Sequence, residues 1–229
     1  MIFKDRIISS SSGSGGGGSS SSGGSSSDSN KKNTDDNDTA AADKKETNNV
    51  SPASTGETVA KLFSDVNNHW AATVIEKAVD RKLFAGVGPQ SFAPDSTMTR
   101  EMFVAVLRNL ANAEIVEPIN FKDVEKDSWY AGSVGWANQA GIVSGISSEE
   151  FGIGKAVTRE QIAVMLYNFA KVNGLQMSED GNVDFADQSF ISDWAMTAVT
   201  AMANEGIIRG RDNGSLDPQG QATRQKLQQ

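Results

Sequence analysis

The chain has 229 residues, a formal net charge of −8 and no cysteine, so disulfides and thiolate metal sites are excluded. Its single histidine, His69, excludes a histidine-based catalytic triad or a two-histidine metal site within the chain, and we expect neither a metal nor a cofactor. The acidic balance argues against nucleic-acid binding, and no apolar run approaches the ~20 residues of a membrane span.

The first quarter of the chain lacks the apolar side chains that a packed domain needs. Residues 1–8 are too short for a signal peptide, and we interpret them as the remnant of an upstream domain, with a short structureless terminus as the alternative. Residues 9–57 are a Ser/Gly tract followed by a polar segment, which predicts a disordered linker. We therefore expect the chain to be a fragment of a longer protein.

The rest of the chain repeats one pattern three times. A Phe-x-Asp precedes a tryptophan, a glycine follows the tryptophan 16 positions later, and a Thr-Arg pair ends 30 positions after it. The repeated residues are Asp65, Trp70, Gly86 and Arg100, then Asp123, Trp129, Gly145 and Arg159, then Asp187, Trp194, Gly210 and Arg224. Matches at this many offsets predict three copies of one structural unit, which we bound at 58–115, 116–178 and 179–229.

Each unit reads as helix, loop, helix. In the first unit we expect a helix from about Trp70 to Phe84 and a second helix capped by Thr99. The second helix carries an apolar stripe that recurs at the same offsets in the second unit; its residues are Phe103, Val106, Leu107 and Leu110, and then Ile162, Met165, Leu166 and Phe169. One unit buries too little to fold alone, so the sequence predicts a mainly α protein in which three units share one helical bundle.

The third unit matches only in part. Thr223 and Arg224 stand at the expected offsets from Trp194, but the sequence stops at Gln229, before the counterparts of the last three stripe residues. A single helical turn is marginal alone, so we expect a frayed last unit and a less stable domain. This puts any groove that involves the third unit in doubt.

Arginines at the starts of the second helices suggest a role in binding anions. The helix dipole disfavours a cation at this end, whereas the free backbone N–H groups there bind anions. Arg100, Arg159 and Arg224 therefore suggest sites for a carboxylate, phosphate or sulfate. The alternative is that each arginine pairs with the aspartate of a Phe-x-Asp motif and closes one unit onto another. The spacing is compatible with an anion site and with an internal ion pair, and it slightly favours the ion pair.

The other repeated residues have two interpretations as well. The tryptophans stand at helix starts, where burial in the core is favoured over stacking on a sugar ring. The aspartates are either turn or capping residues or hydrogen-bond acceptors in a groove between units. The glycines are most simply helix C-caps, or they let a ligand approach the backbone.

The repeat resembles the S-layer homology domain family. The resemblance rests on FSDVNNHW and TRE in the first unit, FKDVEKDSW and TRE in the second, and FADQSFISDW and TRQ in the third, and it covers about Phe63 to Arg224. The sequence departs from the family pattern at single positions, which are Lys82 for glycine, Ile153 for proline and Gln225 for glutamate.

The resemblance implies three helical units that anchor a protein non-covalently to secondary cell-wall polysaccharide, often one with pyruvylated sugars. The partner on the protein side would be an upstream domain or an S-layer protein, and the location extracellular, at the cell wall. The implied groove residues are the repeated Asp, Trp, Gly and Arg of the three units. We expect no catalytic residues, because no carboxylate pair stands out.

The alternative function is a structural or protein-interaction repeat without a glycan site. Arginines that are buried and paired with aspartates would favour it, whereas arginines and tryptophans that line an open groove would favour anchoring.

Overall fold

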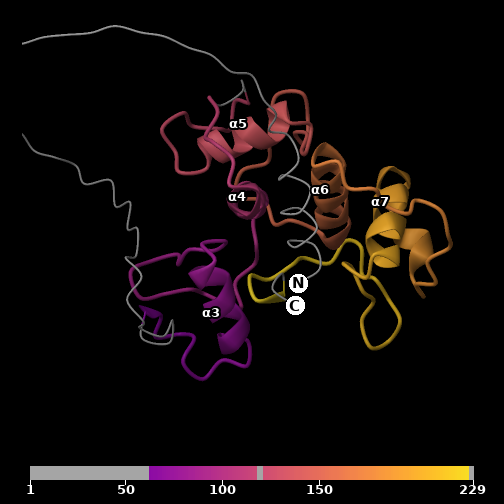
Figure 1. Cartoon of the computed structure of the whole chain (residues 1–229), viewed down its shortest axis with the longest axis horizontal. Helices are drawn as coiled ribbons and strands as arrows, with labels where there is room; N and C mark the ends of the chain where they lie inside the picture. The colour runs from indigo at the N-terminus through magenta and orange to yellow at the C-terminus, as the bar shows by residue number, and fades with distance from the viewer. Residues whose placement is uncertain (1–61, 118–120, 227–229) are drawn as a thin grey trace, which may run out of the picture. The chain divides into compact units, whose positions relative to one another are not determined.

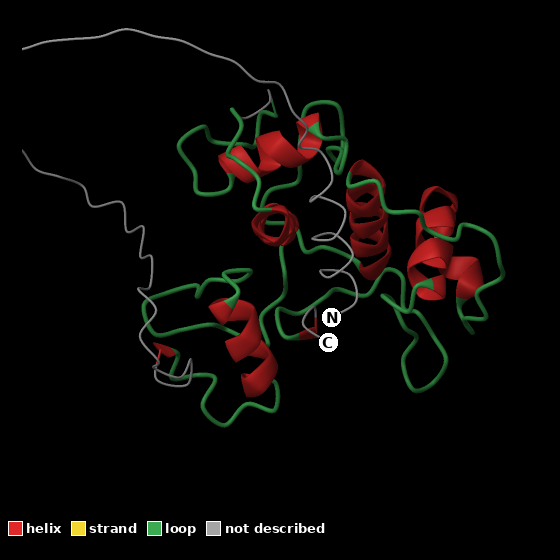
Figure 2. Cartoon of the chain, viewed as in Figure 1, coloured by secondary structure: helices red, strands yellow, loops and turns green. Residues whose placement is uncertain are grey.

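The computed structural model describes residues 62–117 and 121–226, so the predictions for residues 1–8 and 9–57 lie outside the described part. The described part contains five α-helices, one short 3₁₀ helix and no strand, which confirms the predicted mainly α class (Figures 1 and 2). The helices are α3 (Ala72–Asp80), α4 (Arg100–Ala111), α5 (Ala131–Gln139), α6 (Arg159–Val172), η1 (Gln188–Phe190) and α7 (Asp193–Asn204).

The first helix of the first unit is shorter than predicted. Helix α3 ends at Asp80 rather than near Phe84, and Lys82 follows in the left-handed region with φ of 57°. Gly141 and Gly206 hold the same place after α5 and α7, with φ of 73° and 67°. Since a left-handed residue ends these helices, the interpretation of the repeated glycines as C-caps is wrong.

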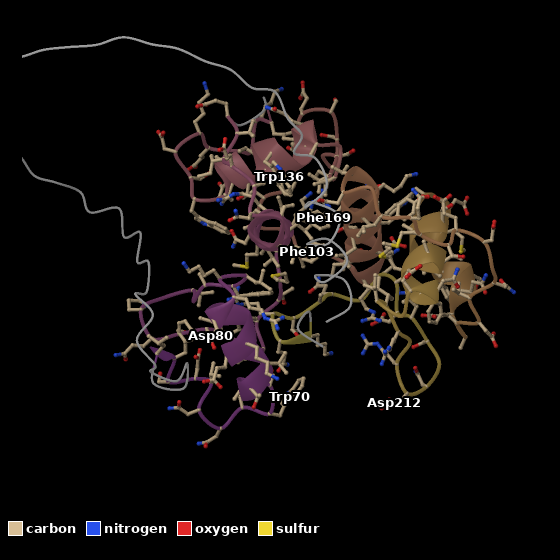
Figure 3. The ribbon with its side chains drawn as sticks, in the orientation of Figure 1. Trp70, Asp80, Phe103, Trp136, Phe169 and Asp212 are labelled. Atoms are coloured by element: carbon tan, nitrogen blue, oxygen red, sulfur yellow. The ribbon has the colours of Figure 1, made fainter. Side chains whose placement is uncertain are left out.

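The second helices contribute the predicted stripes to one core. Phe103 and Leu107 of α4 belong to the same buried cluster as Ile162 and Phe169 of α6. The ring of Trp136 in α5 meets Phe169 edge-on, with centroids 6.4 Å apart (Figure 3). Burial of such apolar side chains is the main stabilising contribution to the fold.

Helix α6 also serves a second cluster. Ala163 and Tyr167 on another face of α6 pack against α7, whose buried face is formed by small residues such as Ala195 and Ala198. Small side chains allow two helices to approach closely, and within the described residues α7 is held by contact with α6.

A closed ring of backbone hydrogen bonds joins the three units. The ring uses the residue before the Thr-Arg pair of each unit. The N–H of Met98 donates to the carbonyl of Ala222 at 2.8 Å, the N–H of Ala222 to Val157 at 3.2 Å, and the N–H of Val157 to Met98 at 2.9 Å. Because each unit both donates and accepts, the third unit completes the ring with residues that precede Lys226. The lower stability of the domain stays a prediction.

Candidate functional site

Arg100, the first residue of α4, reaches across to the second unit. Its Nε donates to the carbonyl of Phe151 at 3.0 Å and its Nη2 to the carbonyl of Ser144 at 2.9 Å. Its backbone N–H donates to Lys155 at 3.0 Å, so the free N–H at this helix start is used within the protein. Arg100 therefore fixes the loop between the helices of the next unit.

The other two arginines repeat this contact in a cycle. Arg159 of the second unit donates to Leu216 and Arg209 of the third, at 2.6 and 2.7 Å. Arg224 of the third unit donates to carbonyls of the first, Phe92 at 2.9 Å and Ala85 at 2.8 Å. We call Arg100, Arg159 and Arg224 the clamp arginines. Within residues 62–117 and 121–226 none of them forms a direct ion pair with an aspartate, so the predicted pairing is wrong as a salt bridge. The charge of a Phe-x-Asp aspartate in the next unit still acts on each arginine and raises its pKa against the lowering by burial, Asp123 on Arg100, Asp187 on Arg159 and Asp65 on Arg224. The arginines do join the units, as that alternative expected.

Two of the clamp arginines are buried beneath aromatic rings. Arg100 is 5% exposed and its Cζ lies 4.9 Å from the centroid of Phe151. Arg224 is 4% exposed and its Cζ lies 4.5 Å from the centroid of Phe92. Burial lowers the pKa of both guanidinium groups. In contrast, Arg159 is only partly buried, and an aliphatic residue, Leu216, stands where the other loops have phenylalanine.

The aspartates hold the same loops from within their own units. Asp123 accepts backbone N–H groups from Phe151, Gly152 and Ile153 at 2.7–2.9 Å. Burial alone would raise the pKa of Asp123, but the three donors outweigh it and the pKa lies below its ordinary value. This arrangement corresponds to the turn-aspartate interpretation.

Asp65 and Asp187 act in the same way. Asp65 accepts from the N–H groups of Phe92 and Ala93 at 2.8–3.1 Å. Asp187 accepts from the N–H groups of Leu216 and Asp217, in the loop of its own unit, at 2.7 Å. For Asp65 too, the donors outweigh the effect of burial and the pKa is lowered. Each loop is thus held by an aspartate of its own unit and by a clamp arginine of the preceding unit.

The tryptophans are on the surface, which corrects the prediction that they belong to the core. Trp70, Trp129 and Trp194 are 61%, 64% and 58% exposed. The residue five positions after each is fully buried; these residues are Ile75, Val134 and Val199. Trp194 lies in α7, where five residues turn the helix by roughly 140° beyond a full circle, so its side chain faces away from the buried Val199. Trp70 and Trp129 lie in the turns that precede α3 and α5.

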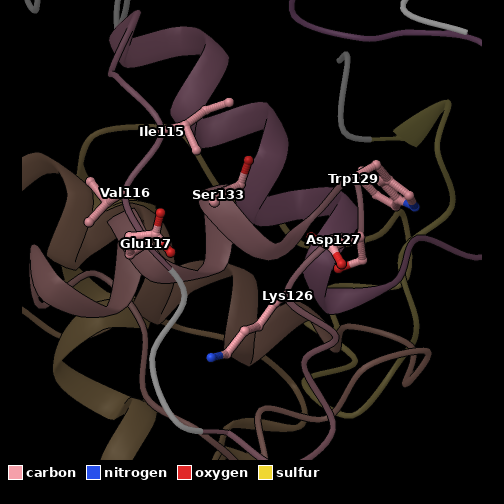
Figure 4. A pocket seen from close by; sticks show the side chains of 9 residues that line it. Ile115, Val116, Glu117, Lys126, Asp127, Trp129 and Ser133 are labelled. Atoms are coloured by element: carbon pink, nitrogen blue, oxygen red, sulfur yellow. The ribbon is translucent and has the colours of Figure 1, made fainter. Parts of the chain in front are cut away.

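A hollow of about 280 Å³ lies beside Trp129 (Figure 4). It is bordered by residues 115–117 at the boundary of the first and second units, by the turn that leads to Trp129 and by the first turn of α5. The lining residues are Ile115, Val116, Glu117, Lys126, Asp127, Ser128, Trp129, Gly132 and Ser133. The hollow combines an indole ring with a cation, carboxylates and hydroxyl groups.

Two glycines of α5 allow the preceding segment to lie close to the helix. A Cβ on Gly132 would stand 2.0 Å from Cγ2 of Ile115, and one on Gly135 would stand 2.5 Å from the carbonyl oxygen of Glu117. At the same offsets the first unit has Thr73 and Glu76. The sequence analysis missed this hollow, and the two glycines are the signal that could have indicated it.

The repeated glycines stand where the loop backbone passes close by. A Cβ on Gly86 would lie 2.4 Å from Phe63, and one on Gly145 would lie 2.4 Å from the carbonyl oxygens of Ser147 and Glu150. The nearest atoms to a Cβ on Gly210 are 3.3 Å away. These glycines therefore make room for the loops that the clamp arginines bind.

The residue after each clamp arginine also crosses between units. Glu160 is 2% exposed and accepts from the N–H and hydroxyl of Ser192 and from Gln219, at 2.6–3.0 Å. At the same position Gln225 donates to Asp95 at 2.7 Å. Sequence reasoning noted the Thr-Arg-Glu pattern without assigning this role to the third residue.

The described part of the chain, 62–117 and 121–226, contains no group of three or more metal-ligating side chains that could hold an ion. None of the helices described there is long and apolar enough to cross a membrane.

Comparison with known proteins gives a family and several relatives. The model of the S-layer homology domain matches residues 62–101, 120–163 and 184–225, which together are more than half of the chain. The chain is 31% identical over 166 residues to an amylopullulanase of Thermoanaerobacterium thermosulfurigenes, covering 72% of the chain and 9% of that protein. It is 32% identical to exoglucanase XynX of Acetivibrio thermocellus (71% and 15%) and 29% identical to the surface-layer 125 kDa protein of Lysinibacillus sphaericus (72% and 14%). The chain thus spans only 9–15% of the length of these relatives.

Proposed function

Because this chain belongs to the S-layer homology domain family, we propose that it is an anchoring module that attaches a larger surface protein to the bacterial cell wall. The relatives support this proposal through their diversity. Two are named as enzymes and one as a surface-layer protein, yet all three share this small segment. A segment common to such different proteins fits a shared means of attachment better than a shared reaction.

The proposed ligand is secondary cell-wall polysaccharide, and the observation that carries this proposal is the exposure of the three tryptophans. An indole ring stacks on the apolar face of a sugar, and Trp70, Trp129 and Trp194 present more than half of their surface to solvent. Around Trp129 the hollow adds Lys126, a cation suited to the carboxylate of a pyruvylated sugar, and groups suited to sugar hydroxyls.

The remaining repeated residues would support these contacts. In this proposal Asp65, Asp123 and Asp187, together with Gly86, Gly145 and Gly210, shape the loops that form the groove walls, and the clamp arginines join each wall to the neighbouring unit. Three weak sites on one chain would act together through their effective concentration. The upstream part of the longer protein, an enzyme or an S-layer protein, would be the tethered partner.

The structural repeat remains the second candidate, because the burial of Arg100 and Arg224 favours it for those two residues. A buried guanidinium that bonds two carbonyls is occupied in holding the fold. The exposure of the tryptophans favours the anchoring function instead. Binding to cell-wall sacculi separates the two functions.

Co-sedimentation with cell-wall sacculi of the source organism tests the proposal, before and after chemical removal of the attached polysaccharide. We expect binding that requires the polysaccharide and that is lost when all three tryptophans are replaced by alanine. A single Trp129→Ala change should weaken binding about tenfold, since loss of an aromatic contact worth about 1.4 kcal/mol has that effect.

Phe190→Ala is the matched control, because Phe190 is an aromatic residue of the third unit that is 73% exposed and does not belong to the repeated pattern. Folded protein that ignores intact sacculi, or a triple tryptophan variant that binds as well as the Phe190 control, would favour the structural repeat.

A further inference from the structure

We infer that the three junctions between units are not equivalent, and that the junction of the second and third units binds the acidic group of the glycan through Arg159, Arg209 and Arg211. This inference rests on the proposed function and refines it. The chemistry recognised is an oxyanion on a sugar, either a ketal carboxylate or a phosphate.

The three clamp arginines differ in how accessible their guanidinium groups are. Arg100 and Arg224 are almost fully buried and face the phenylalanine rings of the loops that they bind. The bond from Nη2 of Arg159 to the carbonyl of Arg209 lies at the exposed surface, whereas the corresponding bonds of the other two are partly buried. A ligand can therefore approach Arg159 without displacing the core.

Leu216 explains this difference. It occupies the position of Phe92 and Phe151, and all three carbonyls accept a bond from a clamp arginine. An aliphatic side chain gives no flat ring over the guanidinium group, so no cation–π contact covers Arg159. The sequence difference at this one position leaves the same arginine buried in two junctions and accessible in the third.

The three equivalent loops also differ in charge. Arg209 and Arg211 flank Gly210, and the residues that flank the equivalent glycines are Ala85 and Val87 in the first unit and Ser144 and Ile146 in the second. The loop of the second unit carries Glu149 and Glu150, which would repel an anion. In the loop of the third unit two cations flank the glycine, and the same loop carries the anion Asp212, which Figure 3 labels. The loop of the second unit has Lys155, whose carbonyl accepts the backbone N–H of Arg100, but no cation beside its glycine.

Arg211 is held in the loop that Arg159 binds, two residues after Arg209. Burial lowers the pKa of Arg159, and the neighbouring charge of Arg211 lowers it further, while Asp217 and Asp187 act in the opposite direction. The backbone N–H of Arg211 donates to Ser215 at 2.7 Å, and its side chain forms an ion pair with Asp217. The loop therefore keeps two guanidinium groups close enough to repel each other.

The carboxylates nearby are already engaged. Asp187 accepts the N–H groups of Leu216 and Asp217, and Asp217 pairs with Arg211. An oxyanion from a ligand would relieve the repulsion between the arginines, and a guanidinium group binds carboxylate or phosphate through paired hydrogen bonds. In this arrangement Arg159, Arg209 and Arg211 contact the ligand, whereas Arg100 and Arg224 are positioning residues.

Replacement by the residues of the second unit gives a sharp test. In the full chain, Arg211→Ile and Arg209→Ser recreate Ile146 and Ser144 on an exposed loop, so the fold should survive. Binding to polysaccharide released from walls of the source organism is measured by calorimetry. We expect at least a tenfold rise in Kd for Arg211→Ile and a larger rise for the double variant.

Arg81→Ser is the matched control, because it removes one positive charge from the exposed end of α3 and should change Kd less than twofold. A double variant that binds as tightly as this control would overturn the inference and leave the proposed function standing. Wild-type chain that does not bind the polysaccharide would overturn the proposed function and this inference with it.

Reduction of the polysaccharide carboxylates to alcohols distinguishes the two sources of the anion. If wild-type affinity falls to that of the double variant, the anion is a carboxylate such as a pyruvate ketal. If affinity is unchanged and still requires Arg211, the anion is phosphate. Affinity that depends on neither the arginines nor the carboxylates would contradict the inference.

Discussion

Arg224 and Arg159 make the same pair of backbone contacts in two different surroundings. Each donates from Nε and Nη2 to two carbonyls of the next unit, but Arg224 lies under Phe92 and Arg159 lies beside Leu216. The comparison shows that joining the units requires only the hydrogen bonds, while the cover over the guanidinium group is free to differ. One repeated position can therefore be purely structural in one junction and open to a ligand in another.

Arg224→Ala should give the largest loss of stability and so sharpen this comparison. The change leaves the carbonyls of Phe92 and Ala85 without their donor, at a cost of about 1–3 kcal/mol each, and removes the side-chain contact between the third and first units. We expect the free energy of unfolding to fall by about 3 kcal/mol or more, measured by urea denaturation.

Arg159→Ala should cost less, about 1–2 kcal/mol, because water can replace the exposed donor at Nη2. Arg81→Ala, on the surface of the first unit, should stay within about 0.5 kcal/mol of wild type. Equal losses for Arg224→Ala and Arg159→Ala would break the comparison, because they would mean that the aromatic cover makes no difference.

Alanine at the repeated glycines compares the loops of the second and third units. A Cβ on Gly145 meets two carbonyl oxygens at 2.4 Å, whereas a Cβ on Gly210 finds its nearest atoms at 3.3 Å. Because overpacking typically costs about 1–3 kcal/mol, we expect Gly145→Ala to lower the free energy of unfolding by about 2 kcal/mol. Gly210→Ala should cost under about 1 kcal/mol. Thermal unfolding of the two variants checks the order, and the reverse order would refute the geometry of these loops.

Acid should weaken the loops of the first two units through their aspartates. The pKa values of Asp65 and Asp123 are lowered on folding, so each carboxylate contributes stability that is complete above its unfolded pKa. That contribution is lost as pH falls through the folded pKa, so wild-type stability should decline below about pH 5. A double Asp65→Asn, Asp123→Asn variant should be less stable by about 1–2 kcal/mol at pH 7 and should show a flatter decline in acid.

Asp187→Asn completes this set as the comparison in the third unit. The Asp187 carboxylate accepts two backbone N–H groups, whereas Asp123 accepts three. The free energy of unfolding at pH 7 should therefore fall less for Asp187→Asn than for Asp123→Asn. Urea denaturation of the single variants at pH 7 and pH 3 measures both effects. A wild-type acid profile that matches the double asparagine variant would show that these carboxylates do not govern the pH dependence.

The tryptophans should give the smallest effect on stability. Each side chain is more than half exposed, and surface substitutions usually change stability by less than about 0.5 kcal/mol. Trp129→Ala should therefore leave the unfolding transition in place while reducing binding to wall polysaccharide. A large loss of stability would mean that Trp129 contributes to the core, as the sequence alone had predicted.

Much of the fold followed from the sequence because its signals are local. The apolar stripes with Phe103 and Ile162 predicted the second helices and their common core, and the offsets between tryptophan and arginine predicted the repeat. The ends of the first helices were misjudged, because Lys82 is a poor signal for a left-handed residue and the later Gly86 is a strong one. The exposed tryptophans were misjudged because an indole at a helix start is compatible with either face.

The sequence by itself determined the repeated unit, its helical character and its family, because these depend on residues within a few turns of one another. Only the tertiary structure decided which unit each clamp arginine contacts. Arg100 reaches a carbonyl 51 residues away and Arg224 one 139 residues away, and no local pattern records such partners. The open junction at Arg159 depends in the same way on Leu216, a distant residue whose effect appears only when folding brings the two together.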